Sequence, residues 1–305
     1  MLLFTHPRCF DHRMQPVHPE SPERLRAVLD YLQSSGLFQA LQMRDATAVT
    51  RARLEAVHDP AYLRELERLL PEDGLTAVDP DTYLCPATLD AAAYAAGAVV
   101  DAVEAVLGGA DQRAFCAVRP PGHHAEIGQA MGFCFYNNVA VGAAAALSHP
   151  EIERVAILDF DVHQGNGTID IFKDRPEVLV CSSFQAPFYP NRHMSLERPN
   201  IVNTRLGAGC DGDAFRQAVE DDWRPALAAH RPQLVLVSAG FDGHRDDPLA
   251  ELELTDNDYR WVTRLIVDAA NATAEGRVVS TLEGGYDLGA LARSVGAHIE
   301  TLAVP

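Results

Sequence analysis

The chain has 305 residues, of which 47% are hydrophobic, and its formal net charge at pH 7 is -18. This composition is typical of a globular protein with a sizeable core, and the acidic charge argues against binding to nucleic acid or to anionic membrane surfaces. Because the six cysteines form no Cys-x-x-Cys pair, and neither a signal peptide nor a membrane-spanning stretch is evident, we expect a cytoplasmic protein without a disulfide scaffold.

Strands and helices are predicted to alternate along the chain. In chain order the predictions are a strand at 2–5, helices at 22–34, 60–70 and 87–107, a strand at 114–118, a helix at 137–147, strands at 155–160 and 178–182, a helix at 211–230, a strand at 234–238, a helix at 255–275, a strand at 278–282 and a helix at 288–302. Ser21 is expected to cap the first helix, with Pro22 at its first position. Loops are expected around residues 7–22 and 187–199.

The predicted strands are almost continuously apolar, which indicates burial on both faces of a parallel sheet. Strands that alternate with helices are typical of an α/β fold. We therefore expect a single domain over residues 1–305, with a mostly parallel central sheet flanked by helices.

Polar motifs follow the ends of four predicted strands, and they carry the candidate chemistry. They are Arg-Pro-Pro-Gly-His-His at 119–124, Asp-Phe-Asp-Val-His at 159–163, Ser-Ala-Gly-Phe-Asp at 238–242 and Leu-Glu-Gly-Gly-Tyr at 282–286. In open α/β sheets, ligands bind in the crevice outside the carboxyl ends of the strands. We therefore expect these motifs to converge, although they are far apart in sequence.

Asp161, His163 and Asp242 are the candidate metal ligands. Asp161 and His163 are two residues apart, so an extended backbone places both on one side, and Asp242 adds a second carboxylate. Three such ligands leave a position open for water or substrate, as in catalytic zinc sites. Taken alone, Asp-x-His is more often a surface salt bridge or a strand-end cap. Asp159 needs a buried partner, either a histidine N–H or a loop that it caps.

His123, His124 and Tyr286 are the candidates for proton transfer and oxyanion stabilisation. Two adjacent imidazoles on a rigid Pro-Pro-Gly loop can divide the roles of base and charged donor between them. A neutral phenol on the Gly-Gly elbow can donate to a developing oxyanion, although the same elbow also fits a tight turn with a half-buried tyrosine. The other histidines are interpreted as structural.

The motifs together resemble the histone deacetylase family of the arginase–deacetylase superfamily. Besides the four motifs above, the resemblance includes Met-Gly-Phe-Cys-Phe-Tyr-Asn-Asn at 131–138, and it extends from about His18 to Leu291. Asn166 and the Leu-Glu-Gly-Gly-Tyr run resemble the class II and bacterial branch, which includes histone deacetylase-like amidohydrolases. The resemblance implies a three-layer arginase/deacetylase-like α/β fold.

The resemblance also implies which residues hold the metals. Zinc would be held by Asp161, His163 and Asp242, and a structural potassium ion would lie near them, bound by backbone carbonyls and Ser182. Two-metal arginase-like members carry an Asp where this chain has Gly240. One zinc ion is therefore favoured over two manganese ions.

For catalysis, the resemblance implies a proton-transfer pair in which Asp159 orients His123 and Asn166 orients His124. An asparagine does not stabilise an imidazolium as a carboxylate does, so the two histidines should differ in basicity. Tyr286 would polarise the scissile carbonyl while metal-activated water attacks it. One of the histidines would then protonate the leaving amine.

For substrate binding, the resemblance implies a narrow tunnel for an acyl-lysine stem, lined by Gly132, Phe133 and Tyr189. Leu249 stands where polyamine deacetylases carry an acidic gatekeeper, which argues against polyamines as the substrate. Leu84 stands where class I enzymes carry the Asp that holds the substrate backbone.

Three functions are compatible with these residues. The first is a zinc-dependent deacylase acting on acetyl-lysine in peptides or proteins, or on a related small acylated amine. The second is a polyamine or other small-molecule deacetylase of the same fold, which parallel assays on acetyl-lysine peptides and acetylpolyamines would distinguish. The third is a non-catalytic module that binds acyl-lysine or a metal, which would be expected to lack a ligand or the tyrosine. Assembly into a homo-oligomer is left open.

Overall fold

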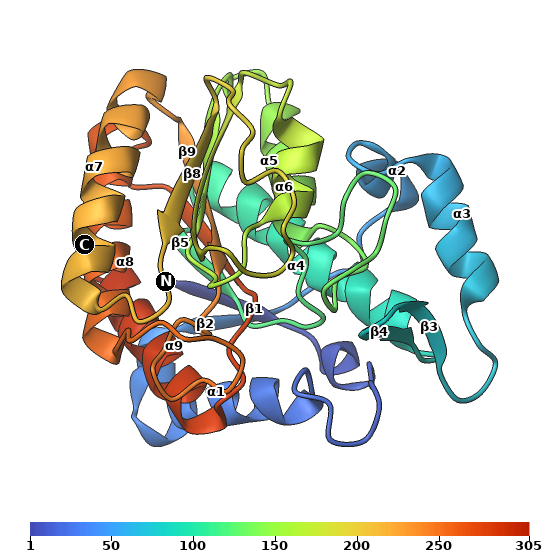
Figure 1. Ribbon diagram of the computed structural model, residues 1–305. Helices are drawn as coiled ribbons and strands as arrows, with labels where there is room; N and C mark the ends of the chain where they lie inside the picture. Colours follow the sequence, from blue (N-terminus) through green and yellow to red (C-terminus); the bar gives the residue numbers. More distant parts are fainter. Residues whose placement is uncertain (305) are drawn as a thin grey trace.

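The computed structural model describes residues 1–304, which form an α/β fold around one eight-stranded sheet (Figure 1). Its strands are β1 (Leu2–Thr5), β2 (Gln42–Asp45), β5 (Arg113–Cys116), β6 (Val155–Asp159), β7 (Val178–Gln185), β8 (Ile201–Leu206), β9 (Leu234–Ala239) and β10 (Val278–Leu282). Their order is β2-β1-β5-β10-β9-β6-β7-β8, and every neighbouring pair is parallel. A separate antiparallel hairpin joins β3 (Thr76–Asp79) to β4 (Thr82–Leu84).

Helices cover both faces of the sheet and give the fold three layers. They are α1 (Pro22–Ser34), α2 (Arg51–Glu55), α3 (Pro60–Leu69), α4 (Thr88–Leu107), α5 (Asn138–Leu147), α6 (Asn166–Phe172), α7 (Gly212–His230), α8 (Asp256–Thr273) and α9 (Leu288–Leu302), with 3-10 turns at Pro7–Phe10 and Leu37–Ala40. On one face α4 and α5 pack against the central strands. On the other face α7 packs against β7 and β8 and α8 against β9, with α9 against α8 and α1 against α9. Figure 1 shows these two layers on the right and left of the sheet. Within residues 1–304, no helix combines the length and apolar character needed to cross a membrane.

Every residue of the central strands is buried, which explains their continuous apolar sequences. No position of β5, β6, β9 or β10 is exposed. In the parallel register, Asp159 at the end of β6 lies beside Ser238 of β9, and Leu282 of β10 lies beside Ala239 of β9. The loops that carry the polar motifs therefore leave the same end of the sheet next to one another.

The α/β prediction is confirmed, and all six predicted strands are present, although the strand predicted at 114–118 already ends at Cys116. The predicted helices are also present within a few residues of their expected ends. Ser21 does occupy the N-cap position of α1, with Pro22 following it, but its side chain accepts no capping hydrogen bond. That part of the prediction is wrong, and only the extended backbone at Ser21 marks the helix start.

Some elements were not predicted because their sequences carry no apolar pattern. The edge strand β2 reads Gln-Met-Arg-Asp and is exposed along its whole length. The other edge strand, β8, is only partly buried, and the β3–β4 hairpin is short. α2 and α6 are too short for helical periodicity to mark them. The 3-10 turn at Pro7–Phe10 lies in a segment that was predicted to be a loop.

Candidate active site

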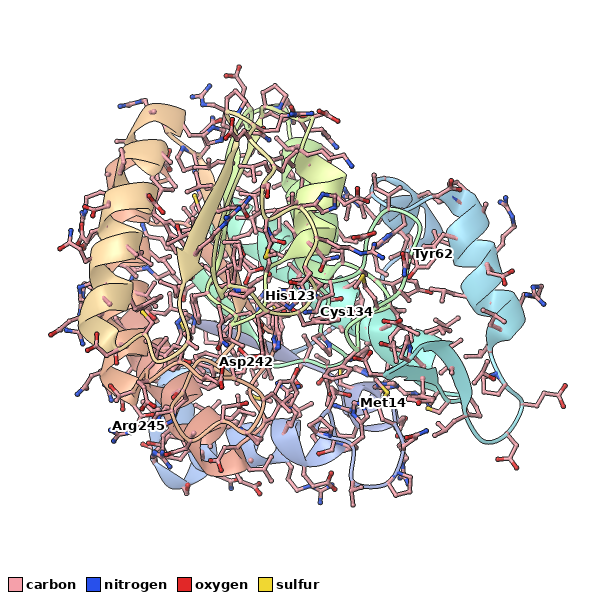
Figure 2. All side chains as sticks on the ribbon, viewed as in Figure 1. Met14, Tyr62, His123, Cys134, Asp242 and Arg245 are labelled. Carbon is pink, nitrogen blue, oxygen red and sulfur yellow. The ribbon has the colours of Figure 1, made fainter. Side chains whose placement is uncertain are left out.

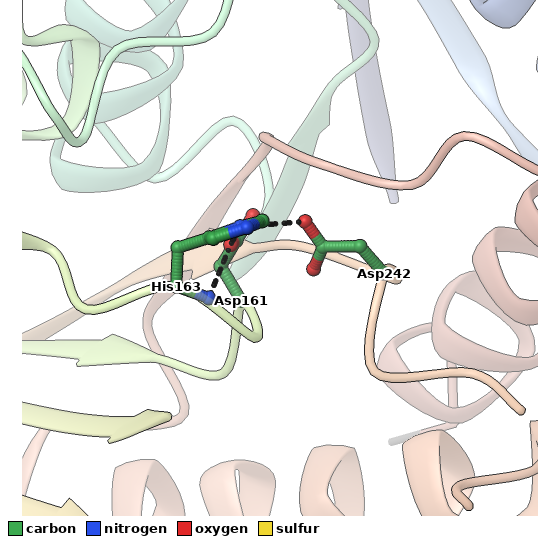
Figure 3. Close-up of side chains that lie close together, drawn as sticks. All are labelled: Asp161, His163 and Asp242. Atoms are coloured by element: carbon green, nitrogen blue, oxygen red, sulfur yellow. Dashed lines mark hydrogen bonds and ion pairs between the residues drawn. The ribbon is translucent and has the colours of Figure 1, made fainter. Parts of the chain in front are cut away.

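Asp161, His163 and Asp242 meet in one cluster at the carboxyl end of the sheet (Figure 3). One ligand atom from each lies within 4.8 Å of the others. Nδ1 of His163 lies 3.1 Å from Oδ1 of Asp161 and 3.2 Å from Oδ2 of Asp242. Both aspartates are buried, and Figure 2 places Asp242 near the middle of the molecule. The structure thus brings together the three residues predicted to bind a metal.

Backbone groups and glycines hold the two carboxylates of this cluster. The N–H of Gly284 donates to Asp161 over 2.8 Å, and the N–H of Val162 donates to Asp242 over 2.9 Å. A Cβ atom at Gly284 would lie 2.1 Å from Oδ2 of Asp242, and one at Gly240 would lie 2.1 Å from Oδ2 of Asp161. Glycine is therefore required at both positions for the carboxylates to approach the chain so closely.

The cluster fits a divalent cation. Oδ2 of Asp242 is buried and accepts no hydrogen bond from the described residues, although it lies at ion-pair distance from His163. Burial opposes the charge on His163, but Asp161 and Asp242 outweigh it and raise the pKa of the imidazole to about 10. Two buried carboxylates thus attract positive charge, which a metal can supply in place of the proton. Two carboxylate oxygens and one imidazole nitrogen form a donor set that zinc accepts.

The tandem histidines lie beside this cluster, and each contacts its predicted partner. Nδ1 of His123 lies 2.9 Å from Oδ2 of Asp159, and Nδ1 of His124 lies 2.6 Å from Oδ1 of Asn166. The two imidazole centroids are 4.0 Å apart. Asp159 ends β6 and Asn166 begins α6, so the loop between these elements supplies both partners.

The two histidines differ in proton affinity, in line with the different partners. Burial lowers the pKa of His123, but the nearby carboxylates of Asp161 and Asp159 raise it well above the usual value. Burial also lowers the pKa of His124, and positive charge on His123 and His163 lowers it further. One imidazole of the pair therefore favours the charged form and the other the neutral form.

Tyr286 faces the same site from the Gly-Gly elbow after β10. Gly285 has φ of +123°, a conformation that favours glycine, and the N–H of Tyr286 donates to Asp247 over 2.6 Å. The guanidinium of Arg24 lies 4.8 Å from the centroid of the Tyr286 ring. Burial raises the pKa of Tyr286 well above its usual value despite Arg24, so the phenol stays a neutral hydrogen-bond donor.

A cavity of about 340 Å³ leads to these side chains. Its lining consists of His18, Pro19, Asp81, His124, Gly132, Phe133, His163, Tyr189, Leu249 and Tyr286. The four residues predicted to bind substrate are all among them. Aromatic rings form much of the wall, since Phe133 meets Tyr286 edge-on and Tyr189 meets His124 edge-on. A wall made largely of aromatic and apolar side chains suits an aliphatic stem.

Sequence reasoning missed buried polar groups that hold the site together. Glu283 accepts the backbone N–H groups of Gly122 at 2.7 Å and of His123 at 3.2 Å. Glu20 pairs with Arg119 through both of its oxygens at 2.7 Å, fully buried. A charged residue directly after an apolar strand was the one available signal for Glu283. The partner of Glu20 lies far along the chain, and only the fold reveals it.

Comparisons with known proteins agree with this geometry. Residues 18–302 match the histone deacetylase domain family. The chain is 40% identical over 276 residues to the histone deacetylase-like amidohydrolase of Pseudomonas aeruginosa, covering 88% of this chain and 72% of that protein. It is 36% identical over 302 residues to polyamine deacetylase HDAC10 of Homo sapiens, covering 93% of this chain and 44% of that protein. The crystal structure of the HDA15 HD domain matches with a TM-score of 0.93 at 31% identity, covering 99% of this chain and 87% of that one.

Proposed function

The chain belongs to the histone deacetylase family, and on that premise we propose that it is a zinc-dependent deacylase. Its substrate is the amide of acetyl-lysine, in a peptide or protein, or of a related small acylated amine. Residues 1–305 act as one catalytic domain in this proposal. A structural potassium ion near Asp161 and Ser182 is part of the same proposal.

One observation carries this proposal. The buried cluster of Asp161, His163 and Asp242, the histidine pair and the phenol of Tyr286 all meet around one cavity. His124 and His163 both line the cavity, and their ring centroids are 5.8 Å apart. An extended acyl-amine that enters the cavity brings its carbonyl to all three groups. A module that only binds acyl groups has no need for the histidine pair.

Asp161, His163 and Asp242 would hold the zinc ion, which would supply a Lewis acid for the carbonyl and a lowered pKa for water. The neutral phenol of Tyr286 donates to the carbonyl oxygen as negative charge develops there. Because its pKa is lowered, His124 is neutral before the reaction, and its imidazole is therefore available to accept the proton of the attacking water.

His123 has the complementary role. Its imidazolium, held by Asp159, keeps a positive charge next to the developing oxyanion. The proton accepted by His124 then passes to the leaving amine nitrogen as the C–N bond breaks. Acetate and a free amine are the products when the acyl group is acetyl.

A small-molecule substrate is the second candidate, favoured by the likeness to a polyamine deacetylase. Asp81 lines the cavity and offers a carboxylate to a cationic amine. Leu249, by contrast, is apolar and lies in the same lining. We rank acetyl-lysine and its analogues first for this reason.

The test is an acyl-substrate panel with bound metal measured on the same sample. Acetyl-lysine peptides, acetylpolyamines and longer acyl chains are assayed with wild-type protein and with Tyr286→Phe. We expect hydrolysis with about one zinc ion bound, and a large loss of kcat in the variant with unchanged zinc content. The proposal would be abandoned if no acylated amine were hydrolysed by the zinc-loaded protein, or if the variant retained full activity.

A further inference from the structure

A chain of three contacts connects the protein surface to His124. Nδ1 of His124 lies 2.6 Å from Oδ1 of Asn166. Nδ2 of Asn166 donates to Oε1 of Glu126 over 2.8 Å, and Oε2 of Glu126 accepts from Arg192 over 2.6 Å. Asn166 is 0% exposed and Glu126 is 8% exposed, so only the arginine end of this chain meets solvent.

The carboxylate of Glu126 fixes the direction of these hydrogen bonds. A carboxylate only accepts, so the amide nitrogen of Asn166 must face Glu126 and its oxygen must face His124. An oxygen acceptor at 2.6 Å requires a hydrogen on Nδ1 of His124. In the neutral imidazole, Nε2 then carries no hydrogen and is free to accept one. Without Glu126, the amide nitrogen would keep only two weak contacts, with the backbone oxygen of His124 and the sulfur of Met131, both at 3.4 Å, and these bias the amide far less than a carboxylate does.

We propose that Glu126 is a positioning residue, which sets the tautomer of His124 through the amide of Asn166. The proposal rests on the role of His124 in the proposed function. Asp159 contacts His123 directly, whereas on the His124 side the negative charge stands one hydrogen bond further away. This arrangement gives His124 a fixed orientation without an adjacent anion that would hold it protonated.

Arg192 extends the same arrangement to the wall of the substrate cavity. It follows Tyr189 by three positions in the loop between β7 and β8. Tyr189 lines the cavity, and Arg192 also contacts the side-chain oxygen of Gln129 at 3.2 Å. Glu126 thus ties this loop to the residue that orients His124.

The direction of the hydrogen bonds from Asn166 can be tested with a variant in which position 166 can only accept them. In Asn166→Asp, the introduced carboxylate stands where an amide nitrogen now lies 2.8 Å from Glu126, so two carboxylates repel each other. We expect kcat to fall about 10-fold or more, in the range known for residues that orient catalytic groups. Adding Glu126→Gln to Asn166→Asp supplies an amide that donates to the introduced carboxylate. The double variant should therefore recover part of the lost kcat but stay below wild type, because the carboxylate beside His124 favours its protonated form.

Single variants and a matched control complete the kinetic test. Glu126→Ala leaves the amide nitrogen of Asn166 with only the two weak contacts at 3.4 Å, so the amide can rotate, and it should lower kcat about 10-fold with KM changed by less than about 2-fold. Glu126→Gln alone retains an acceptor oxygen and should lose less. Glu104→Gln removes a carboxylate that pairs with Arg53 away from the site, and it should match wild type. The proposal is wrong if Glu126→Ala or Asn166→Asp keeps wild-type kcat, or if Glu126→Gln fails to improve Asn166→Asp.

A spectroscopic readout keeps this inference separate from the proposed function. Nitrogen-15 NMR of histidine-labelled, zinc-loaded protein reports which ring nitrogen of His124 carries hydrogen. We expect a single form with Nδ1–H in wild type and a mixture of forms in Glu126→Ala. If the protein hydrolysed no acylated amine but showed these spectra, the proposed function would fail and the role of Glu126 would stand. Identical spectra for the two proteins would overturn the role of Glu126, whatever the activity.

Discussion

The backbone N–H of Tyr286 donates to Oδ2 of Asp247 over 2.6 Å, and this contact holds the Gly-Gly elbow to the loop after β9. The same oxygen lies 3.4 Å from the N–H of Asp287, while Oδ1 accepts from the N–H of Leu249 at 3.0 Å. Asp247 is buried. A single carboxylate therefore fixes two residues that line the cavity, Tyr286 and Leu249.

Replacing Asp247 with alanine should displace the phenol of Tyr286 and lower kcat more than it raises KM. Leaving a buried N–H without its acceptor costs about 1–3 kcal/mol, which corresponds to roughly 5–150-fold in rate. Steady-state kinetics on the best acyl substrate measures this. Asp246→Ala is the matched control, because its side chain is 53% exposed, and it should remain close to wild type. Equal kinetics for the two variants would show that Asp247 does not position Tyr286.

Replacing Asp242 with alanine should abolish both metal binding and activity. The variant retains only two of the three ligands of the cluster. Loss of a hydrogen bond to a metal ligand typically lowers metal affinity about 10–100-fold, and loss of a ligand itself should lower it further. Competition with a chromogenic chelator measures the affinity, and Asp221→Ala, on the exposed side of α7, provides the control. Retention of a full equivalent of metal by Asp242→Ala would contradict the ligand assignment.

Replacing Leu249 with glutamate should shift selectivity toward cationic acylamines. The new carboxylate would enter the lining of the cavity, where attraction to an ammonium group is worth about 1–4 kcal/mol at contact distance. We expect the ratio of kcat/KM for an acetylpolyamine to that for an acetyl-lysine peptide to rise about 10-fold or more. Leu249→Gln has a similar shape without the charge and should leave the ratio nearly unchanged. An equal shift in both variants would show that charge is not the cause.

His298 should make the fold sensitive to acid. It is fully buried among Phe115, Phe160 and Phe241, and burial lowers its pKa to about 3. Below pH 6.5 the unfolded chain gains a proton on this residue while the folded protein does not. The stability that the neutral ring contributes is therefore complete above pH 6.5 and is lost as the pH falls toward 3.

The measurement for His298 is the free energy of unfolding by denaturant at pH 7 and pH 5. In wild type, His298 should account for a loss of about 2 kcal/mol between these values, since one pH unit corresponds to about 1.4 kcal/mol. His298→Gln removes the titrating group, so its loss over the same interval should be smaller by that amount. A parallel decline in the two proteins would show that His298 does not titrate on unfolding.

The residues that meet in the site could largely be predicted from the sequence, because each follows an apolar strand. Adjacent parallel strands bring their following loops together, so the ends of β6 and β9 place Asp161 next to Asp242. The contacts of His123 with Asp159 and of His124 with Asn166 were likewise expected from the family resemblance.

The groups that support the site could not be predicted in the same way. Glu126 and Asp247 lie in loops, and nothing in their local sequence distinguishes them from solvated carboxylates. Their burial depends on segments distant in sequence, such as the loop that carries Arg192. The edge strand β2 was not predicted for a related reason. It is defined by its pairing with β1, and all of its residues are exposed, so its sequence carries no apolar pattern.

The glycine at position 240 also limits how this site can change over evolution. The first carbon of any side chain at Gly240 would lie 2.1 Å from Oδ2 of Asp161. A carboxylate introduced at that position would therefore push Asp161 out of the cluster before it could join it. A further ligand from this position would require the end of β9 to move. The path of the backbone thus limits the ligand set of the cluster as much as the choice of side chains does.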